Sequence, residues 1–335
     1  MKRGAETKWL IIALTALLCY NCSDDDSDDD KIGNWAERST FNEEPRSSSA
    51  AFTIGDKGYM GTGYDGDDYL GDFWSYDMNT NSWQQLADFP GIARSSAVSF
   101  TIGNNGYIGT GFNGDSNEEL GDFYQYNLDT NTWSPIANFG GSPRYGAVGF
   151  ESDTHGYVGT GFDGDGDKKD FWKYDPTSDT WEEIFGFGGD KRRDGATFKI
   201  GTDVYLLSGV SNGIYEEDFW VFDTIDETWT ALDDLDDDDD DDFIMRANAV
   251  AFNLNDRGYL ACGEIGGVAI DIVWEYNPTT QDWTERTEFE RTARRDAVAF
   301  SNGNRAFVTL GRNGTLYLDD NMEFFPTEEQ DDDDN

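Results

Sequence analysis

The chain has 335 residues, of which 24 are Lys or Arg and 68 are Asp or Glu, so its formal net charge is 24 − 68 = −44. Its aromatic content of 15% and its 38 glycines predict a folded domain with an acidic surface, because a disordered polyanion has few rings. Such a surface repels the phosphates of nucleic acids and of anionic membranes, which excludes these partners. One His and three Cys are too few for most zinc, copper and haem sites.

Residues 1–21 have the pattern of an export signal. Lys2, Arg3 and Lys8 precede an apolar run at 9–18, which is too short to span a bilayer and fits the core of a secretory signal. We therefore expect the chain to leave the cytoplasm.

A cysteine at the end of such a run resembles the bacterial lipobox, in which the thiol is acylated and becomes the new N-terminus. Cys22 is the predicted lipidation site, because the acidic segment 22–33 resembles the tether of surface lipoproteins of the Bacteroidota. Cys19 is an alternative site, and a plain cleaved signal followed by an acidic linker is a third interpretation. The resemblance implies an outer membrane lipoprotein exposed at the cell surface, which contacts the membrane only through its lipid anchor.

A repeat of about 50 residues dominates the rest of the chain. Tryptophans recur at spacings of 50, 48, 48 and 54, and each has an aromatic residue seven positions upstream, across a polar turn that fits two short strands. An arginine follows each of them, after eleven residues in four cases and after seventeen in the fifth, where the run 236–242 is inserted. The tryptophans are Trp83, Trp133, Trp181, Trp229 and Trp283.

The two ends of the repeat complete each other. Trp35 precedes Arg46 by eleven residues, so it belongs to the last strand of a unit whose earlier strands are missing from the N-terminus. The sequence 294–324 supplies earlier strands and lacks the final tryptophan. We therefore predict an all-β propeller with six blades of four antiparallel strands at residues 34–325. Its last blade is closed by the strand around Trp35, and residues 326–335 form an acidic tail.

These features resemble the kelch family, whose blades are about 50 residues long. The resemblance rests on the aromatic and tryptophan seven apart, on the Gly pair in sequences such as 59–63, and on the arginine that opens each unit. In the later units we expect Ser208, Cys262 and Leu310 to replace the first glycine of the pair.

The resemblance implies that acidic loops gather on one face of the propeller. Within these loops, Asp163, Asp165 and Asp167 alternate with glycine, as hard cations such as Ca²⁺ prefer, and they form the predicted metal site. The other interpretation is a solvated polar turn. Calcium is the only cofactor that the sequence suggests.

The six repeated arginines are the predicted ligand-binding residues. We expect them to form a ring at the mouth of a central channel, where guanidinium groups would bind an anionic sugar, a carboxylate or an acidic peptide. The other interpretation is structural, with each arginine paired to an aspartate of the third strand. The arginines are Arg46, Arg94, Arg144, Arg192, Arg246 and Arg294.

Regular repeats without a catalytic constellation predict a lipid-anchored propeller that binds a protein or glycan ligand through its loop face, without catalysis. The alternative is an enzyme on anionic sugars, either a sialic-acid-type epimerase or mutarotase, or a glycosidase. Glu264, which breaks the six-fold pattern, is then the most visible catalytic candidate. A purely structural adhesion module is a third hypothesis. The large net charge opposes self-association and predicts a monomer.

Overall fold

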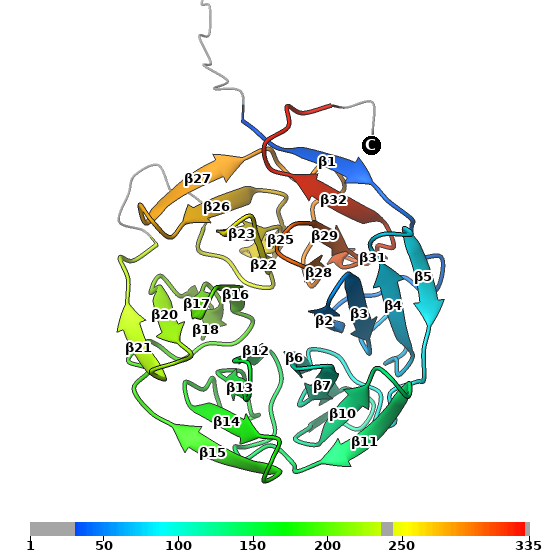
Figure 1. Ribbon diagram of the computed structural model, residues 1–335, viewed down its shortest axis with the longest axis vertical. Helices are drawn as coiled ribbons and strands as arrows, with labels where there is room; N and C mark the ends of the chain where they lie inside the picture. Colours follow the sequence, from blue (N-terminus) through cyan, green and yellow to red (C-terminus); the bar gives the residue numbers. More distant parts are fainter. Residues whose placement is uncertain (1–30, 236–243, 332–335) are drawn as a thin grey trace, which may run out of the picture. The chain divides into compact units, whose positions relative to one another are not determined.

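The computed structural model describes residues 31–235 and 244–331. These residues form six four-stranded antiparallel sheets and four two-stranded hairpins. Figure 1 shows the six sheets as blades around a central axis, with the first strand of each blade innermost. The predicted six-bladed all-β propeller is therefore confirmed. Within the described ranges, no helix has the length and apolar character needed to cross a membrane.

Blades 1 to 6 are numbered by their inner strands. The first strands are β2 (Ala50–Ile54), β6 (Val98–Ile102), β12 (Val148–Glu151), β16 (Ala196–Ile200), β22 (Val250–Leu254) and β28 (Val298–Ser301). The second strands are β3 (Lys57–Gly61), β7 (Asn105–Gly109), β13 (Gly156–Gly159), β17 (Asp203–Leu207), β23 (Arg257–Ala261) and β29 (Ala306–Thr309).

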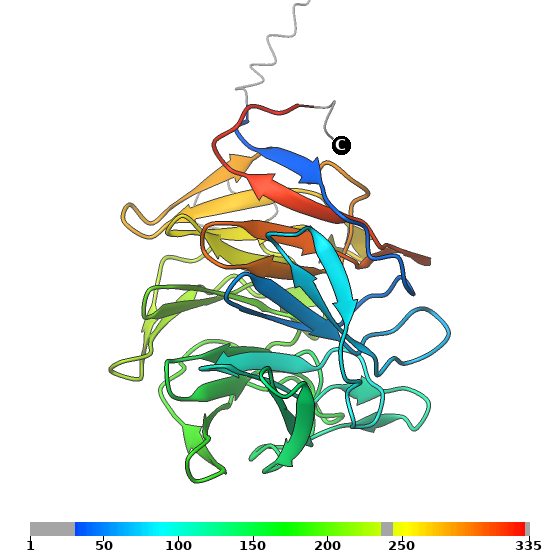
Figure 2. The ribbon, with the colours of Figure 1, turned by 45° about the vertical axis from the view of Figure 1, so that its right-hand side comes forward.

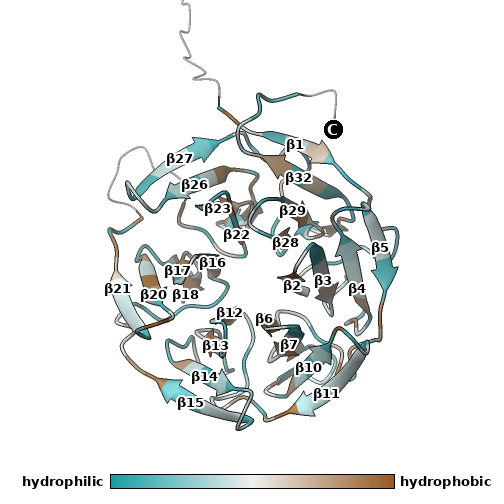
Figure 3. Cartoon of the chain, viewed as in Figure 1, coloured by the Kyte–Doolittle hydropathy of each residue, from teal (hydrophilic) through white to brown (hydrophobic). Residues whose placement is uncertain are grey.

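The outer half of each blade continues the same order. The third strands are β4 (Phe73–Asp77), β10 (Phe123–Asn127), β14 (Phe171–Asp175), β20 (Trp220–Asp223), β26 (Val273–Asn277) and β32 (Asn321–Phe325). The fourth strands are β5 (Ser82–Gln85), β11 (Thr132–Ile136), β15 (Thr180–Ile184), β21 (Thr228–Ala231), β27 (Asp282–Arg286) and β1 (Asn34–Glu37). These outermost strands are mostly hydrophilic, as Figure 3 shows.

The connections after the second strand are more regular than the long loops that the sequence suggested. In four blades they fold back as hairpins: β8 (Phe112–Asn113) with β9 (Glu118–Glu119), β18 (Val210–Ser211) with β19 (Ile214–Tyr215), β24 (Glu264–Ile265) with β25 (Val268–Ala269), and β30 (Arg312–Asn313) with β31 (Leu316–Tyr317). They share one side of the propeller with the connections between blades, and we call this side the loop face. The opposite side is the far face.

The N-terminal strand closes the ring. In blade 6, β1 pairs with β32 so that Trp35 lies opposite Phe324, as Trp83 lies opposite Tyr76 in blade 1. Figures 1 and 2 show the blue β1 beside the red β32. Trp35 is fully buried, and its ring packs against Phe324 and Phe289 with centroids 4.5 and 4.8 Å apart. The predicted closure is therefore confirmed.

Neighbouring blades pack through a large residue on one and a small residue on the next. Phe100, on the inner strand of blade 2, packs against Gly156 of blade 3. A Cβ atom added to Gly156 would stand only 2.1 Å from the Phe100 ring. Phe52 meets Gly106 in the same way at 2.0 Å. Only glycine permits an approach this close, which explains the aromatic-Gly pattern of the second strands.

In blades 1 to 3 the recurring tryptophan bonds the connection that precedes its blade. Trp133 donates its Nε1–H to the backbone oxygen of Ala87 at 2.8 Å, and the backbone N–H of Ala87 donates to Asn131 Oδ1 at 2.9 Å. Trp83 bonds Ser39 and Trp181 bonds Ala137 in the same way. The polar turn and its tryptophan therefore recur because they act together in holding neighbouring blades.

The register of the Gly pair differs from the sequence interpretation by one residue. Strand pairing aligns Leu207, Ala261 and Thr309 with the first glycine, Gly61. Ser208, Cys262 and Leu310 instead align with the middle residue, Thr62, and all of these have φ between 57° and 62°. The expectation was wrong because sequence spacing gave no sign that the middle position is left-handed.

Replacing Trp35 by Ala should lower the free energy of unfolding by about 3–5 kcal/mol, since a fully buried indole at the closing strand is lost. The measurement is guanidinium denaturation followed by circular dichroism. Ile32→Ala is the control, because Ile32 lies just before the same strand and is 45% exposed. It should change stability by no more than ~0.5 kcal/mol. Equal midpoints for the two variants would contradict the closing role of Trp35.

Candidate binding site on the loop face

The six repeated arginines lie inside the blades. Each is at most 1% exposed, and five of them form ion pairs with the third-strand aspartate of their own blade. In blade 3, Arg144 Nη1 and Nη2 donate to Asp170 Oδ1 and Oδ2 at 2.7 and 2.9 Å. Burial alone would raise the pKa of Asp170, but the hydrogen bonds and charge of Arg144 hold it below its ordinary value. The other pairs are Arg46–Asp72, Arg94–Asp122, Arg192–Asp218 and Arg294–Asp320.

Blade 5 departs from this pairing. Ile272 stands at the aspartate position, and Arg246 Nη1 donates to the backbone oxygens of Cys262 and Ile272 at 2.8 and 2.9 Å. Burial lowers the pKa of Arg246 to about 9. In all six blades the guanidinium is enclosed, so a ligand on the loop face does not reach it in this structure. Ligand contact by the six arginines stays a prediction, and it would require their release from these partners.

Each buried arginine also fixes the left-handed residue after the second strand. Arg144 Nη1 donates to the backbone oxygen of Thr160 at 2.9 Å, and the other five arginines make the same bond. A left-handed β-branched residue is strained. The arginine therefore stabilises a backbone turn that directs the next residues onto the loop face.

A closed circuit of backbone hydrogen bonds surrounds the channel mouth. The residue two positions after each arginine is left-handed, with φ between 51° and 60°, and it donates its N–H to the equivalent oxygen of the preceding blade at 2.8–3.1 Å. The circuit returns to its start in six steps, which sets the positions of the six residues. We call these the mouth residues: Ser48, Ser96, Gly146, Asp194, Asn248 and Asp296.

The mouth residues break the six-fold symmetry that the scaffold keeps. Blades 1 to 3 place serine or glycine there, whereas blades 4 to 6 place Asp194, Asn248 and Asp296. A cavity of about 270 Å³ lies along the channel, and its lining includes the residues that follow the mouth residues. Sequence reasoning missed this set, although its constant spacing from the repeated arginines is visible.

Both acidic and basic side chains surround Asp194 and Asp296. Asp296 Oδ2 accepts from Arg312 Nε at 3.0 Å, and Asp194 Oδ2 lies 3.5 Å from Arg193 Nε. Burial and the charge of Asp296 raise the pKa of Asp194 to about 7, despite the guanidinium groups nearby. Arg295 also forms an ion pair with Glu264, so the predicted catalytic candidate lies beside the mouth with its carboxylate already engaged.

An arc of aromatic rings borders the other half of the mouth. The arc consists of six half-buried rings: Tyr317, Tyr64, Tyr69, Phe112, Tyr145 and Phe162. Successive rings contact one another with centroids 4.8–6.4 Å apart. The guanidinium of Arg193 stacks over the last of them at 5.5 Å. The loop face therefore combines flat apolar rings with a cluster of paired charges.

The predicted calcium ligands do not converge. Asp163 accepts from Ser142 and forms an ion pair with Lys168 at 2.6 Å. Although burial opposes it, these contacts lower the pKa of Asp163 to about 2. Asp167 is bound instead by Arg193 at 2.7 Å. Across the described part of the chain, no group of three or more His, Cys, Asp or Glu side chains is placed to hold a metal, and calcium binding by these three residues stays a prediction.

Two other predictions concern residues outside the described ranges. The lipidation site Cys22, with its alternative Cys19, lies in residues 1–30, and the acidic run 236–242 lies in 236–243.

Asp194→Asn should stabilise the protein at pH 8 and have little effect at pH 4. The folded protein keeps a proton on Asp194 up to about pH 7, whereas the unfolded chain releases it near its ordinary pKa of 3.8. The free energy of unfolding of the wild type therefore falls as pH rises from 4 to 7. Asp194→Asn lacks the titrating group, so its free energy of unfolding does not include this fall. We expect a gain of ~1 kcal/mol or more at pH 8 in denaturant unfolding.

The control for this experiment is Asp68→Asn, which removes an exposed carboxylate of the same face. Burial raises the pKa of Glu216 to about 7 as well, so some pH dependence should remain in Asp194→Asn. A stability difference between wild type and Asp194→Asn that does not grow between pH 4 and 8 would refute the assignment.

Comparison with known proteins agrees with this architecture. Residues 17–151 match the family model described as the KLHDC2/KLHL20/DRC7 Kelch-repeats domain. The solved structure entitled "Structure of YjhT" is similar, with a TM-score of 0.73 and 18% identity, over 85% of this chain and 96% of that chain. At this identity the likeness shows the fold alone, and no curated protein matches the chain. The match to a kelch-repeat model, the six four-stranded blades and their repeated arginine and tryptophan together identify the fold as a six-bladed kelch-type β-propeller.

Proposed function

We propose that this propeller binds a glycan at the centre of its loop face without turning it over. The observation that carries the proposal is that the scaffold repeats in all six blades, whereas the two halves of the mouth differ from each other. One half offers an arc of half-buried rings, and the other offers Asp194, Asn248 and Asp296. Flat rings suit the apolar faces of sugars, and short polar side chains on a rigid backbone suit their hydroxyl groups.

The charge balance at the mouth favours a neutral glycan over an anionic one. Three guanidinium groups face four carboxyl groups there, and every guanidinium has a carboxylate within ion-pair distance. The remaining mouth positions supply Ser, Gly and Asn, which carry no charge. An anionic sugar would have to displace a carboxylate from its arginine, and the stabilisation from the existing ion pair would then be lost. The residues in this cluster are Arg193, Arg295, Arg312, Asp167, Asp194, Glu264 and Asp296.

One observation favours an enzyme as the second candidate. Asp194 has its pKa raised to about 7 by burial and by the neighbouring Asp296, and a carboxyl group that titrates near neutral pH is suited to acid and base catalysis. In this candidate Asp194 would be the proton donor, with Asp296 as the neighbouring carboxyl group. Turnover rather than binding alone then distinguishes the two proposals.

The test is saturation-transfer NMR on the purified chain with neutral and anionic oligosaccharides, repeated over a day. Neutral glycans should receive saturation while their own peaks stay unchanged. Tyr145→Ala should weaken binding about fivefold, because a lost ring contact is worth about 1 kcal/mol. Phe185→Ala is the matched control, because this ring is 78% exposed and lies outside the arc.

The outcomes separate the candidates. Binding that is equal in Tyr145→Ala and Phe185→Ala, or that is confined to anionic sugars, contradicts the proposed site. New peaks that grow with time, and that disappear in Asp194→Asn, would establish the enzyme instead.

We also propose that the propeller is held at the cell surface by a lipid on Cys22, as a monomer of an outer membrane lipoprotein. The sequence of the first 33 residues supports this proposal. Expressed in a bacterium that acylates lipoproteins, the chain should partition into detergent, and Cys22→Ala should move it to the aqueous phase. If Cys19→Ala has that effect and Cys22→Ala does not, the anchor is at Cys19.

A further inference from the structure

The end of the channel that opens on the far face has a chemistry of its own. A cavity of about 460 Å³ lies there, and its lining includes Thr53, Glu151, Lys199, Asn253 and Ser301. A second cavity of about 220 Å³, which shares these five residues, continues toward the loop face. The site is therefore at the opposite end of the channel from the mouth residues, and it does not depend on the function proposed for them.

The polar side chains of this cavity come from one position of the repeat. Each of the five lies seven residues after a repeated arginine, next to the inner-strand phenylalanine that packs in the blade. Blades 1 and 2 carry threonine there, and the next four carry Glu151, Lys199, Asn253 and Ser301. The scaffold repeats its arginine, phenylalanine and tryptophan closely, so it does not dictate four different polar residues at this position.

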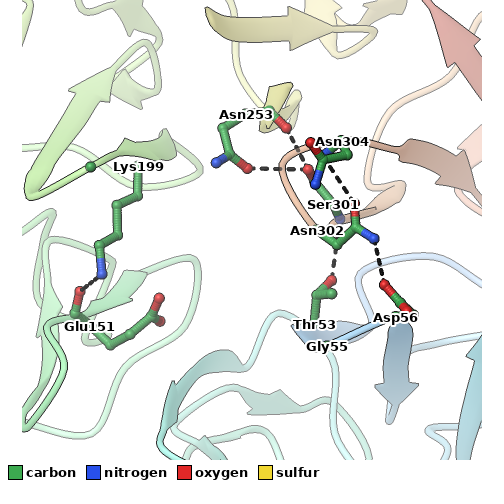
Figure 4. A pocket seen from close by; sticks show the side chains of 10 residues that line it. Thr53, Gly55, Asp56, Glu151, Lys199, Asn253, Ser301, Asn302 and Asn304 are labelled. Atoms are coloured by element: carbon green, nitrogen blue, oxygen red, sulfur yellow. Dashed lines mark hydrogen bonds between the residues drawn. The ribbon is translucent and has the colours of Figure 1, made fainter. Parts of the chain in front are cut away.

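Glu151 and Lys199 stand on neighbouring blades without pairing to each other. Lys199 Nζ donates to the backbone oxygen of Glu151 at 3.0 Å, and Glu151 Oε2 accepts a long bond from the N–H of Thr101 at 3.3 Å. Figure 4 shows the Glu151 carboxylate turned away from the Lys199 ammonium toward the open centre of the cavity. One anionic and one cationic group thus face the same space, each with bonding capacity left.

The surroundings of Glu151 disfavour the charged form of its carboxyl group. Burial raises the pKa of Glu151, although the charge of Lys199 and the Thr101 N–H oppose the rise. Glu151 is half-buried, and a carboxylate withdrawn in part from water is stabilised by a cation that bonds it directly. An ammonium group of a ligand would provide this bond, while Lys199 stays available for an anionic group of the same ligand.

A third polar group faces the two charges. Asn253 accepts from Ser301 Oγ at its Oδ1, at 3.1 Å, which leaves its Nδ2 end directed into the cavity in Figure 4. The rim carboxylate Asp56 is engaged by the amides of Asn79 and Asn302 at 3.0 and 2.8 Å. Glu151, Lys199 and Asn253 therefore each present a donor or an acceptor to the cavity.

We propose that the far mouth binds a free α-amino acid. Its α-ammonium group bonds the Glu151 carboxylate, its carboxylate bonds the Lys199 ammonium, and its side chain extends toward Asn253 and Ser301. A molecule with only one of the two charges leaves the opposite group of the pocket unmatched, and for this reason the site selects a zwitterion.

The test is isothermal titration calorimetry of the purified chain with three probes of similar size. L-alanine has both charges, N-acetyl-L-alanine has only the carboxylate, and L-alaninamide has only the ammonium. L-alanine should bind at least tenfold more tightly than either analogue. Glu151→Gln should reduce L-alanine to the affinity of N-acetyl-L-alanine, and Lys199→Met should reduce it to that of L-alaninamide. Asp56→Asn, which removes a charge at the rim of the same cavity, should change affinity less than twofold.

Several results would overturn the proposal. Absence of L-alanine binding to the wild type is one, and equal affinity for the three probes is another. Retained L-alanine binding in both Glu151→Gln and Lys199→Met also overturns it. Loss of L-alanine binding in Tyr145→Ala, with both far-mouth variants unaffected, would place the amino acid on the loop face. Each variant is first compared with wild type by its unfolding midpoint, and the two far-mouth variants lie on different blades, so that one remains informative if the other fails to fold.

Discussion

The buried arginine that opens each blade joins three parts of the chain that would be unstable without it. Its guanidinium bonds the left-handed residue after the second strand and, in five blades, the aspartate that begins the third strand. The arginine needs these acceptors because an isolated buried charge is costly. The carboxylate in turn accepts two bonds from the guanidinium and a further one from an indole, as Asp170 does from Arg144 and from Trp172 Nε1. Blade 5, which has Ile272 in place of the aspartate, keeps the same left-handed turn at Cys262, and there Arg246 bonds two backbone oxygens instead.

The same arginine connects blades through its backbone. The N–H of Gly161 in blade 3 donates to the oxygen of Arg192 in blade 4 at 2.7 Å, and equivalent bonds run around the ring until Gly311 meets Arg46. The circuit of mouth residues lies two positions further along the chain. Because backbone groups form both circuits, the mouth side chains are free to differ between blades without loss of the scaffold. Function has room to vary at these positions, and the arginines themselves do not.

The sequence predicted the fold because its main determinants are periodic and local. Trp35 lies eleven residues before Arg46, as other repeated tryptophans lie before theirs, and this spacing was enough to predict a closure between strands almost 290 residues apart. The arginines show the limit of the same reasoning. Their spacing revealed that they recur, but whether a guanidinium faces a channel or an aspartate depends on the direction of its side chain, which spacing does not contain.

The candidate site was harder to predict, because its residues break the repeat. Asp194 and Asp296 come next to Arg193 and Arg295, and in the sequence they look like ordinary surface charges. Their importance comes from left-handed backbone geometry and from neighbours on other blades, as when Asp296 of blade 6 acts on Asp194 of blade 4. Asp163 and Asp167 show the same limit. Their spacing suits a cation, but spacing does not contain the ion pairs that they form with Lys168 and Arg193.

The distribution of positive charge explains why neither end of the channel is simply acidic. The chain has 24 Lys and Arg against 68 Asp and Glu. Six arginines are enclosed in the blades, and three more are paired at the loop-face mouth, so the outer surface is left with a large excess of carboxylates. A polyanion approaching this surface is repelled at long range. A neutral glycan is not repelled. A zwitterion is not repelled either, because its two charges cancel at long range and act separately only at the short distances over which they contact Glu151 and Lys199. The ligand classes proposed for the two ends of the channel are thus those that the field of the whole molecule admits.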